Sequence, residues 1–243
     1  MFKHKFDQAP DGIVIFHWFM LSFNGGCINA GGFLATGKFV SHVTGFATLF
    51  GVDIMTSQVA AAISMLTVPL FFLLGSFIAG LLIDRPMDQG KRPHFDWVMG
   101  LSAICLLGAA AGGFSNFGGF GDFLRLKHAF LLLAMLCLAS GLQNGAITAS
   151  SLRSVRTTHL TGITTDLGLG LARLFTFNLE KEKYQKEVRS NQLRIGSIVS
   201  FVLGSAVGAF IFLKLGYAGF LLPVVITAYA SWHGRKQKLN FLP

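Results

Sequence analysis

The stretch SHVTGFATLF, residues 41–50, contains a His-x-Thr-Gly motif that recurs in THLTGITTDL, residues 158–167. The two histidines, His42 and His159, lie 117 positions apart (159 minus 42) in a chain of 243 residues. Each copy follows an apolar run that contains glycines and amide side chains, and each precedes a segment too short to cross a bilayer. The doubled motif therefore predicts a chain built from two related halves.

The composition predicts a membrane protein. Hydrophobic residues make up 52% of the chain and charged residues only 13%, about half of the charged share in a typical soluble domain. The mean hydropathy is +0.59. The sequence contains 29 glycines, a residue that lets membrane helices approach closely. These values favour a polytopic helical protein over a soluble domain.

Apolar runs long enough to cross a bilayer as helices need about 20 residues. The sequence offers six such candidates: 13–35, 59–83, 95–114, 128–150, 195–213 and 215–232.

Positive charge is distributed unevenly around these spans. The regions on one predicted side (the N-terminus, the second and fourth loops and the tail) hold sixteen of the twenty Lys and Arg residues. The positive-inside rule then predicts that both termini lie in the cytoplasm. The net charge of +9 is explained by topology and by contact with anionic lipids, so we expect no nucleic-acid partner.

We predict an all-α membrane protein with six transmembrane helices arranged as an inverted 3+3 repeat with two broken or re-entrant HxTG segments. The first three-helix repeat covers residues 1–115 and the second covers 116–243, within one membrane domain. Gly26 and Asn29 of the first half align with Gly141 and Asn144 of the second. Because each half has an odd number of spans, the second half enters from the opposite side, as in many transporters. This topology predicts that the first motif lies near the outer side and the second near the inner side.

Polar residues at and before the two motifs are the candidate solute-binding set. His159 and Asp166 lie seven residues apart, so that a helix would place them on one face, where the pair can bind a proton or a cation. Two structural alternatives remain open: Thr-Gly can simply start a helix, and the amides can join helices by hydrogen bonds. The predicted substrate-binding residues are Asn29, His42, Thr44, Gln143, Asn144, Arg156, His159, Thr161, Thr165 and Asp166.

We expect neither a metal site nor a cofactor, and no enzymatic activity. HExxH, P-loop and GxSxG motifs are absent from the sequence, and the predicted topology separates His42 from His159. An intramembrane enzyme that uses His159 and Asp166 as an acid–base pair is a weaker alternative, because no nucleophile or metal set accompanies them.

The sequence predicts a small transporter or channel-like permease for an unidentified small solute or ion, with its pathway at the interface of the two repeats. The alternative is a non-transporting membrane scaffold or sensor that acts through the basic cytoplasmic segment 177–194. The expected partners are membrane lipids and the solute. Paired glycines at 108 and 112, 141 and 145, and 204 and 208 allow close helix packing within or between chains, which makes a homo-oligomer compatible with the sequence.

The quoted motifs also resemble a known family. GGCINAGGF, FVSHVTG, SGLQNGAITASSLRSVRTTHLTG and TTDLG are similar to segments of the YoaK-like family of bacterial integral membrane proteins, long a domain of unknown function. The resemblance covers nearly the whole chain and implies a bacterial inner-membrane protein of about six spans, without a substrate. It differs at Asn29, where the family often has Asp, and at Phe46, where it often has Asn. The family's marked positions fall on Gln143, Asn144, Arg156, Thr157, Thr158, Thr161, Gly162, Thr165 and Asp166.

Overall fold

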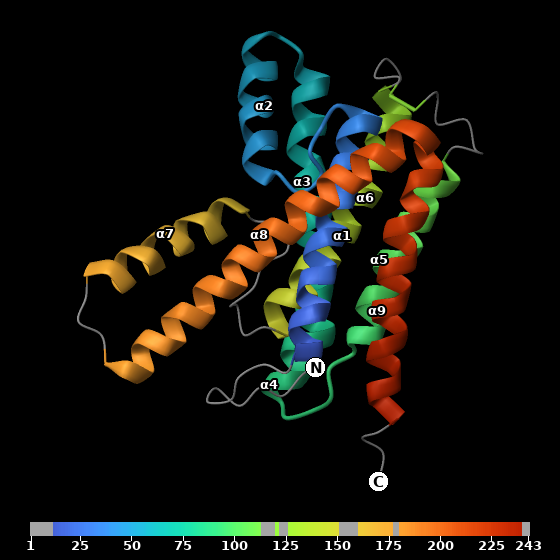
Figure 1. Ribbon diagram of the computed structural model, residues 1–243. Coiled ribbons are helices and arrows are strands. Elements are labelled where there is room, and N and C mark those ends of the chain that lie inside the picture. The colour runs from blue at the N-terminus through green and yellow to red at the C-terminus, as the bar shows by residue number, and fades with distance from the viewer. Residues whose placement is uncertain (1–11, 113–119, 122–125, 151–159, 177–179, 240–243) are drawn as a thin grey trace.

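The computed structural model describes residues 12–112, 120–121, 126–150, 160–176 and 180–239. All regular structure within these ranges is helical (Figure 1). The first half contains α1 (Gly12–Thr36), α2 (Val43–Met55), α3 (Val59–Ala79), the π-helical turn η1 (Gly80–Asp84), α4 (Arg85–Asp88) and α5 (Phe95–Ala111). The second half contains α6 (Leu126–Ser150), α7 (Leu160–Thr176), α8 (Lys181–Leu215), the 3-10 turn η2 (Gly216–Phe220) and α9 (Leu221–Leu239).

The predicted spans coincide with helices wherever the structure describes them. Four helical stretches are long and apolar enough to cross a bilayer: Gly12–Thr36, Ala62–Asp88, Phe130–Ser150 and the stretch Lys181–Lys236, in which a tight turn joins α8 to α9. The apolar helix α5 has 17 residues, a length of about 26 Å, slightly less than the hydrocarbon thickness. The described part of the chain is therefore all-helical and carries several helices of membrane type.

Helix α8 is longer than the predicted span 195–213. It has 35 residues and begins at Lys181, so the polar segment before the span is the first part of the same helix. Lys, Glu, Gln and Arg are strong helix formers, and no proline or glycine interrupts residues 181–195. The predicted surface helix is thus continuous with the apolar part of α8.

Helices α1 and α8 pack closely through glycines. A Cβ atom on Gly26 would meet the carbonyl oxygen of Phe201, and one on Gly204 would meet the carbonyl oxygen of Phe23. The Ser205 hydroxyl donates to the Gly26 carbonyl oxygen at 3.4 Å. Only glycine permits such an approach of two helix backbones.

Helices α3 and α6 repeat this contact. A Cβ atom on Gly141 would meet the carbonyl oxygen of Phe72, and one on Gly75 would meet the carbonyl oxygen of Leu138. The Ser76 hydroxyl donates to the Gly141 carbonyl oxygen at 3.2 Å. The first long helix of each half therefore packs against the second long helix of the other half.

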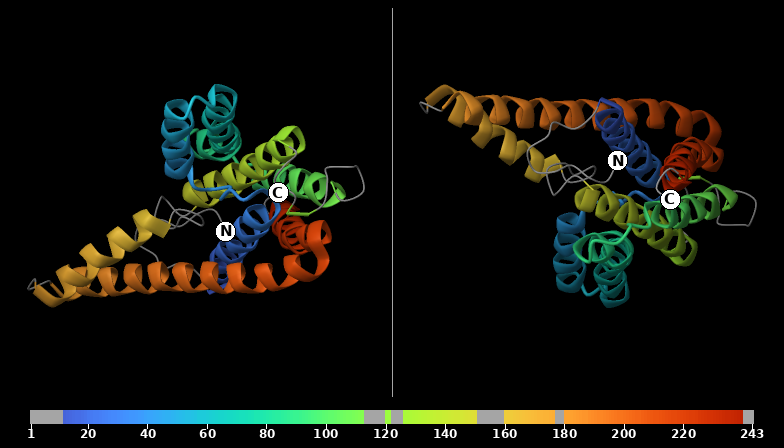
Figure 2. Two further views of the ribbon diagram at one scale, coloured as in Figure 1. Left: turned by 90° about the horizontal axis from the view of Figure 1, so that it is seen from above. Right: turned by 90° about the horizontal axis from the view of Figure 1, so that it is seen from below.

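Two helical pairs flank the centre of the molecule. Figure 2 shows α2 with α3 on one side and α7 with α8 on the other, with α1, α5, α6 and α9 between them. The start of α1 and the end of α9 lie at the same end of the bundle as α4, whereas α2 and the α8–α9 turn lie at the other (Figure 1). The buried core is divided into a cluster around Leu106, Leu136 and Phe212 and a second around Leu21 and Phe95.

Candidate functional site

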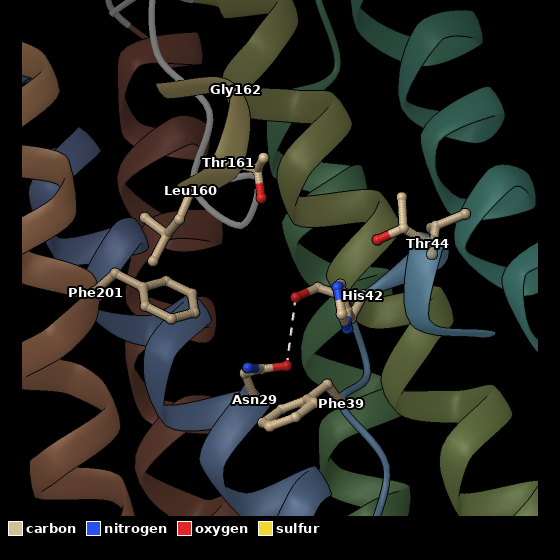
Figure 3. Close-up of a pocket in the computed structure, with 10 residues that line it drawn as sticks. Asn29, Phe39, His42, Thr44, Leu160, Thr161, Gly162 and Phe201 are labelled. Carbon is tan, nitrogen blue, oxygen red and sulfur yellow. Dashed lines mark hydrogen bonds between the residues drawn. The ribbon is translucent and has the colours of Figure 1, made fainter. Parts of the chain in front are cut away.

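Residues of both halves enclose a pocket of about 390 Å³. Its walls come from α1, the segment before α2, the first turns of α2 and α7, and α8 (Figure 3). The lining residues are Asn29, Phe39, Ser41, His42, Val43, Thr44, Leu160, Thr161, Gly162 and Phe201. The two HxTG segments, far apart in sequence, thus meet at one site.

The chain reverses sharply between α1 and α2. Gly37 has φ +68°, a left-handed conformation that suits glycine and commonly ends a helix. The Thr36 hydroxyl donates to the Gly32 carbonyl oxygen at 2.7 Å, and the Cys137 thiol of α6 donates to the Val40 carbonyl oxygen at 2.9 Å. These contacts hold the segment that leads to α2 against α6.

His42 precedes the first residue of α2, and its ring lies over the first turn. A Cβ atom on Gly45 would approach the His42 Nδ1 atom to 2.5 Å, so the glycine of the motif makes room for the imidazole. Phe39 stacks on Phe33 at a centroid distance of 4.5 Å and presents its plane to His42 at 6.1 Å. The spacing of histidine and glycine in the first motif therefore has a steric reason.

The pocket faces the N-terminus of α2 and the first described turn of α7. The N–H groups of a helix's first turn have no partner within the helix, and they carry partial positive charge. The side chain of His42 makes no capping hydrogen bond to α2. Among the described lining residues none is acidic, so this arrangement favours an anion or a neutral hydrogen-bond acceptor over a bare cation.

Polar side chains from α1, from the segment before α2 and from the first described turns of α2 and α7 surround the pocket. The Ser41 hydroxyl donates to the Asn29 Oδ1 atom at 3.4 Å, which Figure 3 shows beside His42. Thr44 and Thr161 are exposed and come from opposite walls of the pocket (Figure 3). Within the described ranges no group of three His, Cys, Asp or Glu residues is close enough to hold a metal ion.

The structure brings four of the ten predicted site residues together: Asn29, His42, Thr44 and Thr161. Thr165 and Asp166 lie further along α7 on its exposed surface, and the Thr165 hydroxyl donates to the Thr161 carbonyl oxygen at 3.0 Å. The predicted residues Arg156 and His159 lie outside the described residues, as do Thr157 and Thr158.

The predicted separation of the motifs is wrong in one respect. Leu160, Thr161 and Gly162 line the same pocket as His42, so the two motifs are not held at opposite ends of the molecule. The reason is that α2 and α7 both begin beside the pocket, and α7 runs away from the bundle from there (Figure 1).

Gln143 lies in a buried polar network instead of the pocket. The Asn24 Nδ2 group donates to the Gln143 Oε1 atom at 2.7 Å and to the Thr227 hydroxyl oxygen at 2.9 Å. The Gln143 Nε2 group donates to the Leu21 carbonyl oxygen at 2.8 Å. All three polar side chains are fully buried, and they join α1, α6 and α9. Gln143 therefore joins helices by hydrogen bonds, as the structural alternative for the amide side chains predicts.

The sequence reasoning missed Ser41, Phe39 and Phe201 as lining residues. Ser41 and Phe39 adjoin His42, so their position beside the motif was the available signal. Phe201 lies on α8 opposite Gly26, and nothing in its local sequence points to the pocket.

A charged cluster attaches α7 to the polar part of α8. The Glu187 carboxylate lies 3.2 Å from the Arg173 Nε atom and 3.0 Å from the Arg194 Nη1 atom. Partial burial acts to raise the pKa of Glu187, but the hydrogen bonds and positive charges of Arg194 and Arg173 outweigh it and lower that pKa. Gly170 of α7 packs directly on this cluster.

Several helices are long and apolar enough to cross a bilayer. They are joined by buried amide hydrogen bonds and by close contacts at glycine, so the described part of the chain is that of a helical protein of membrane type. Residues 17–232 match the family described as protein of unknown function, DUF1275. The chain therefore belongs to this family, in agreement with its resemblance to the YoaK-like proteins. Neither a curated protein nor a solved structure matches the chain.

Proposed function

We propose that the protein is a small inner-membrane transporter or channel-like permease, without enzymatic activity, whose pathway lies between two inverted three-helix repeats. The observation that carries the proposal is that residues of both HxTG segments line one pocket of about 390 Å³. Transporters with inverted repeats hold their solute where interrupted helices of the two halves meet.

Matched contacts support the inverted repeat. Gly26 meets the carbonyl oxygen of Phe201, and Gly141 meets that of Phe72. The serines that follow the glycines Gly204 and Gly75 donate to the carbonyl oxygens of Gly26 and Gly141. Each half thus uses the same residue types at the same spacing against the other half, as a pseudo-two-fold axis requires.

The charge and aromatic distribution supports the orientation. Trp97 at the start of α5 and Trp232 near the end of α9 are exposed, and the Lys236 ammonium lies over the Trp232 ring at 4.0 Å. Tryptophan and lysine favour the membrane interface. With the excess of Lys and Arg at this end, the proposal places it and both termini in the bacterial cytoplasm, with lipids around the exposed apolar side chains.

The chemistry of the pocket supports a small polar solute, either an anion or a neutral hydrogen-bond acceptor. The N-terminus of α2, the His42 imidazole and the hydroxyls of Thr44 and Thr161 offer donors. Loss of one such donor removes about 1 kcal/mol of binding, which is a factor of about five.

The test is solute entry into proteoliposomes. Vesicles containing the purified protein are diluted into iso-osmotic potassium nitrate, formate or phosphate with valinomycin, and swelling is followed by light scattering. We expect Thr44→Val and Thr161→Val to slow swelling about fivefold, because each loses a pocket hydroxyl. Thr48→Val is the matched control, since its hydroxyl donates to the Thr44 carbonyl oxygen at 3.1 Å on the outer surface of α2 and does not line the pocket. Equal rates for all three variants would remove the pocket from the pathway.

A scaffold or sensor remains the second candidate. Its supporting observation is that α7 and the polar part of α8 extend away from the bundle (Figure 1), where they offer a surface to a partner. Deletion of residues 181–190 should leave some flux in a permease, whereas a sensor should lose its output and show no flux in either form.

A further inference from the structure

Two facing helices carry buried polar atoms that the described residues leave without hydrogen-bond partners. On α1 these are the Trp18 Nε1 and Ser22 Oγ atoms, besides His17 Nε2 and Asn24 Oδ1 on other faces, and on α6 they are the Asn144 Oδ1 and Thr148 Oγ1 atoms. Trp18 is 3% exposed, Ser22 0% and Asn144 7%. Buried polar groups are nearly always paired, so this concentration of unpaired ones on two neighbouring helices needs an explanation.

On α1 these residues share a face with the pocket. At about 100° per residue, Trp18, Ser22 and Asn29 lie within about 40° of one another around the helix. Asn29 lines the pocket. By the same spacing, Asn24 with its α6 contact belongs to another face, and Gly26 with its α8 contact lies about 40° beyond Ser22, so the polar face borders α8. The unpaired atoms therefore continue the pocket-lining face of α1 toward the helix start.

On α6 the matching face also points to the pocket region. Asn144 and Thr148 lie within about 40° of the direction of Cys137, whose thiol contacts Val40 in the segment that leads to His42. Gly141, which faces α3, lies about 20° from Thr148, so this face borders α3, whereas Gln143 faces α1.

Both faces turn to the same side of the α1–α6 contact. Asn24 meets Gln143, whereas Gly32, later in α1, meets Leu136, earlier in α6, so the helices are antiparallel. Each polar face is rotated by about 90° about its own helix axis, in the direction in which the chain winds, from the face that meets the partner helix. For antiparallel right-handed helices, equal rotations of this kind point both faces to one side.

We propose that Trp18, Ser22, Asn144 and Thr148 line the inner half of the solute pathway, which continues from the pocket along the groove between α1 and α6 and is closed in this structure. This inference rests on the proposed function. When the groove opens, the four polar atoms gain water or solute as partners, which explains why they are retained in the closed form. The indole N–H, two hydroxyls and one amide suit a small hydrogen-bonding solute, the class that the pocket also favours.

Cysteine labelling tests the groove without knowledge of the solute. In a background with Cys27, Cys105 and Cys137 replaced by alanine, single Ser22→Cys and Thr148→Cys variants are treated in inverted vesicles with a small membrane-impermeant methanethiosulfonate, and modification is followed by intact-protein mass spectrometry. The matched control is Ser102→Cys, because Ser102 is also 0% exposed but donates to the Ala139 carbonyl oxygen at 3.1 Å in the α5–α6 contact. Thr44→Cys reports on the pocket itself.

We expect Ser22→Cys and Thr148→Cys to react about tenfold faster or more than Ser102→Cys, because only the groove opens to water. If Thr44→Cys reacts while both groove cysteines are as slow as Ser102→Cys, the inner pathway is refuted and the pocket stands. If Thr44→Cys is equally slow, the proposed aqueous pathway fails together with the groove.

Discussion

The close helix contacts at glycine predict that a glycine-to-alanine substitution changes the free energy of unfolding in opposite directions at two places in the chain. In Gly141→Ala the new Cβ atom would meet the Phe72 carbonyl oxygen and lie 2.9 Å from its carbonyl carbon. These are backbone atoms, so relief requires α3 and α6 to move apart. In Gly51→Ala, on the exposed side of α2, the new Cβ atom has nothing within 4 Å.

The magnitudes follow from two opposing terms. Alanine is favoured over glycine within a helix by about 0.5–1 kcal/mol, and this term applies to both variants. Overpacking costs about 1–3 kcal/mol and applies only to Gly141→Ala. We therefore expect Gly51→Ala to be stabilised by about 0.5–1 kcal/mol and Gly141→Ala to be destabilised by up to about 2.5 kcal/mol.

The assay is unfolding in mixed micelles as the fraction of dodecyl sulfate is raised, followed by circular dichroism. Gly26→Ala should match Gly141→Ala within about 0.5 kcal/mol, because both glycines oppose a phenylalanine carbonyl oxygen. Gly168→Ala, which also has open space around its Cβ position, repeats the control in the second half. If Gly141→Ala proved as stable as Gly51→Ala, the close backbone approach of α3 and α6 would be refuted.

Two further predictions concern side-chain contacts. Asn24→Ala and Gln143→Ala should show a coupling free energy of about 0.6–1.7 kcal/mol in a double-mutant cycle of the same unfolding assay, and additive effects would contradict their 2.7 Å hydrogen bond. The lowered pKa of Glu187 means that its contribution to α7–α8 attachment is full above the ordinary glutamate pKa and is lost as the pH falls through the lowered value. Spin labels on α7 and α8 should therefore separate only in acid, below the ordinary glutamate pKa, whereas Glu187→Gln should show a pH-independent separation; separation of the unsubstituted protein at neutral pH would contradict the ion pairs.

The positions of the membrane helices were predictable because burial in lipid requires long apolar runs. The run around Asn24 and Asn29 and the run before Gln143 both proved to be helices. Which face of each helix turns inward was not predictable, because lipid and protein core are both apolar and the hydrophobic periodicity that marks a soluble helix is lost. Hence Asn29 and Gln143 entered the same predicted site, although the structure places the first in the pocket and the second in a dry network.

The meeting of the two motifs was only partly predictable. The repeat predicts that His42 and His159 are related, and the interface of the halves was the expected site. Their distance depends on where α2 and α7 begin along the bundle axis, which is set by contacts such as that of Cys137 with Val40. Long-range contacts of this kind leave no local signal in a single sequence.

The unbroken length of α8 has a mechanical consequence. Helix α8 packs on α1 from Gly196, which meets the Phe19 ring, to Phe212, which meets Gly31. Residues 181–195 project beyond this contact by about 22 Å. Because the projecting part holds α7 through Glu187, a tilt of α8 against α1 moves α7, and with it one wall of the pocket.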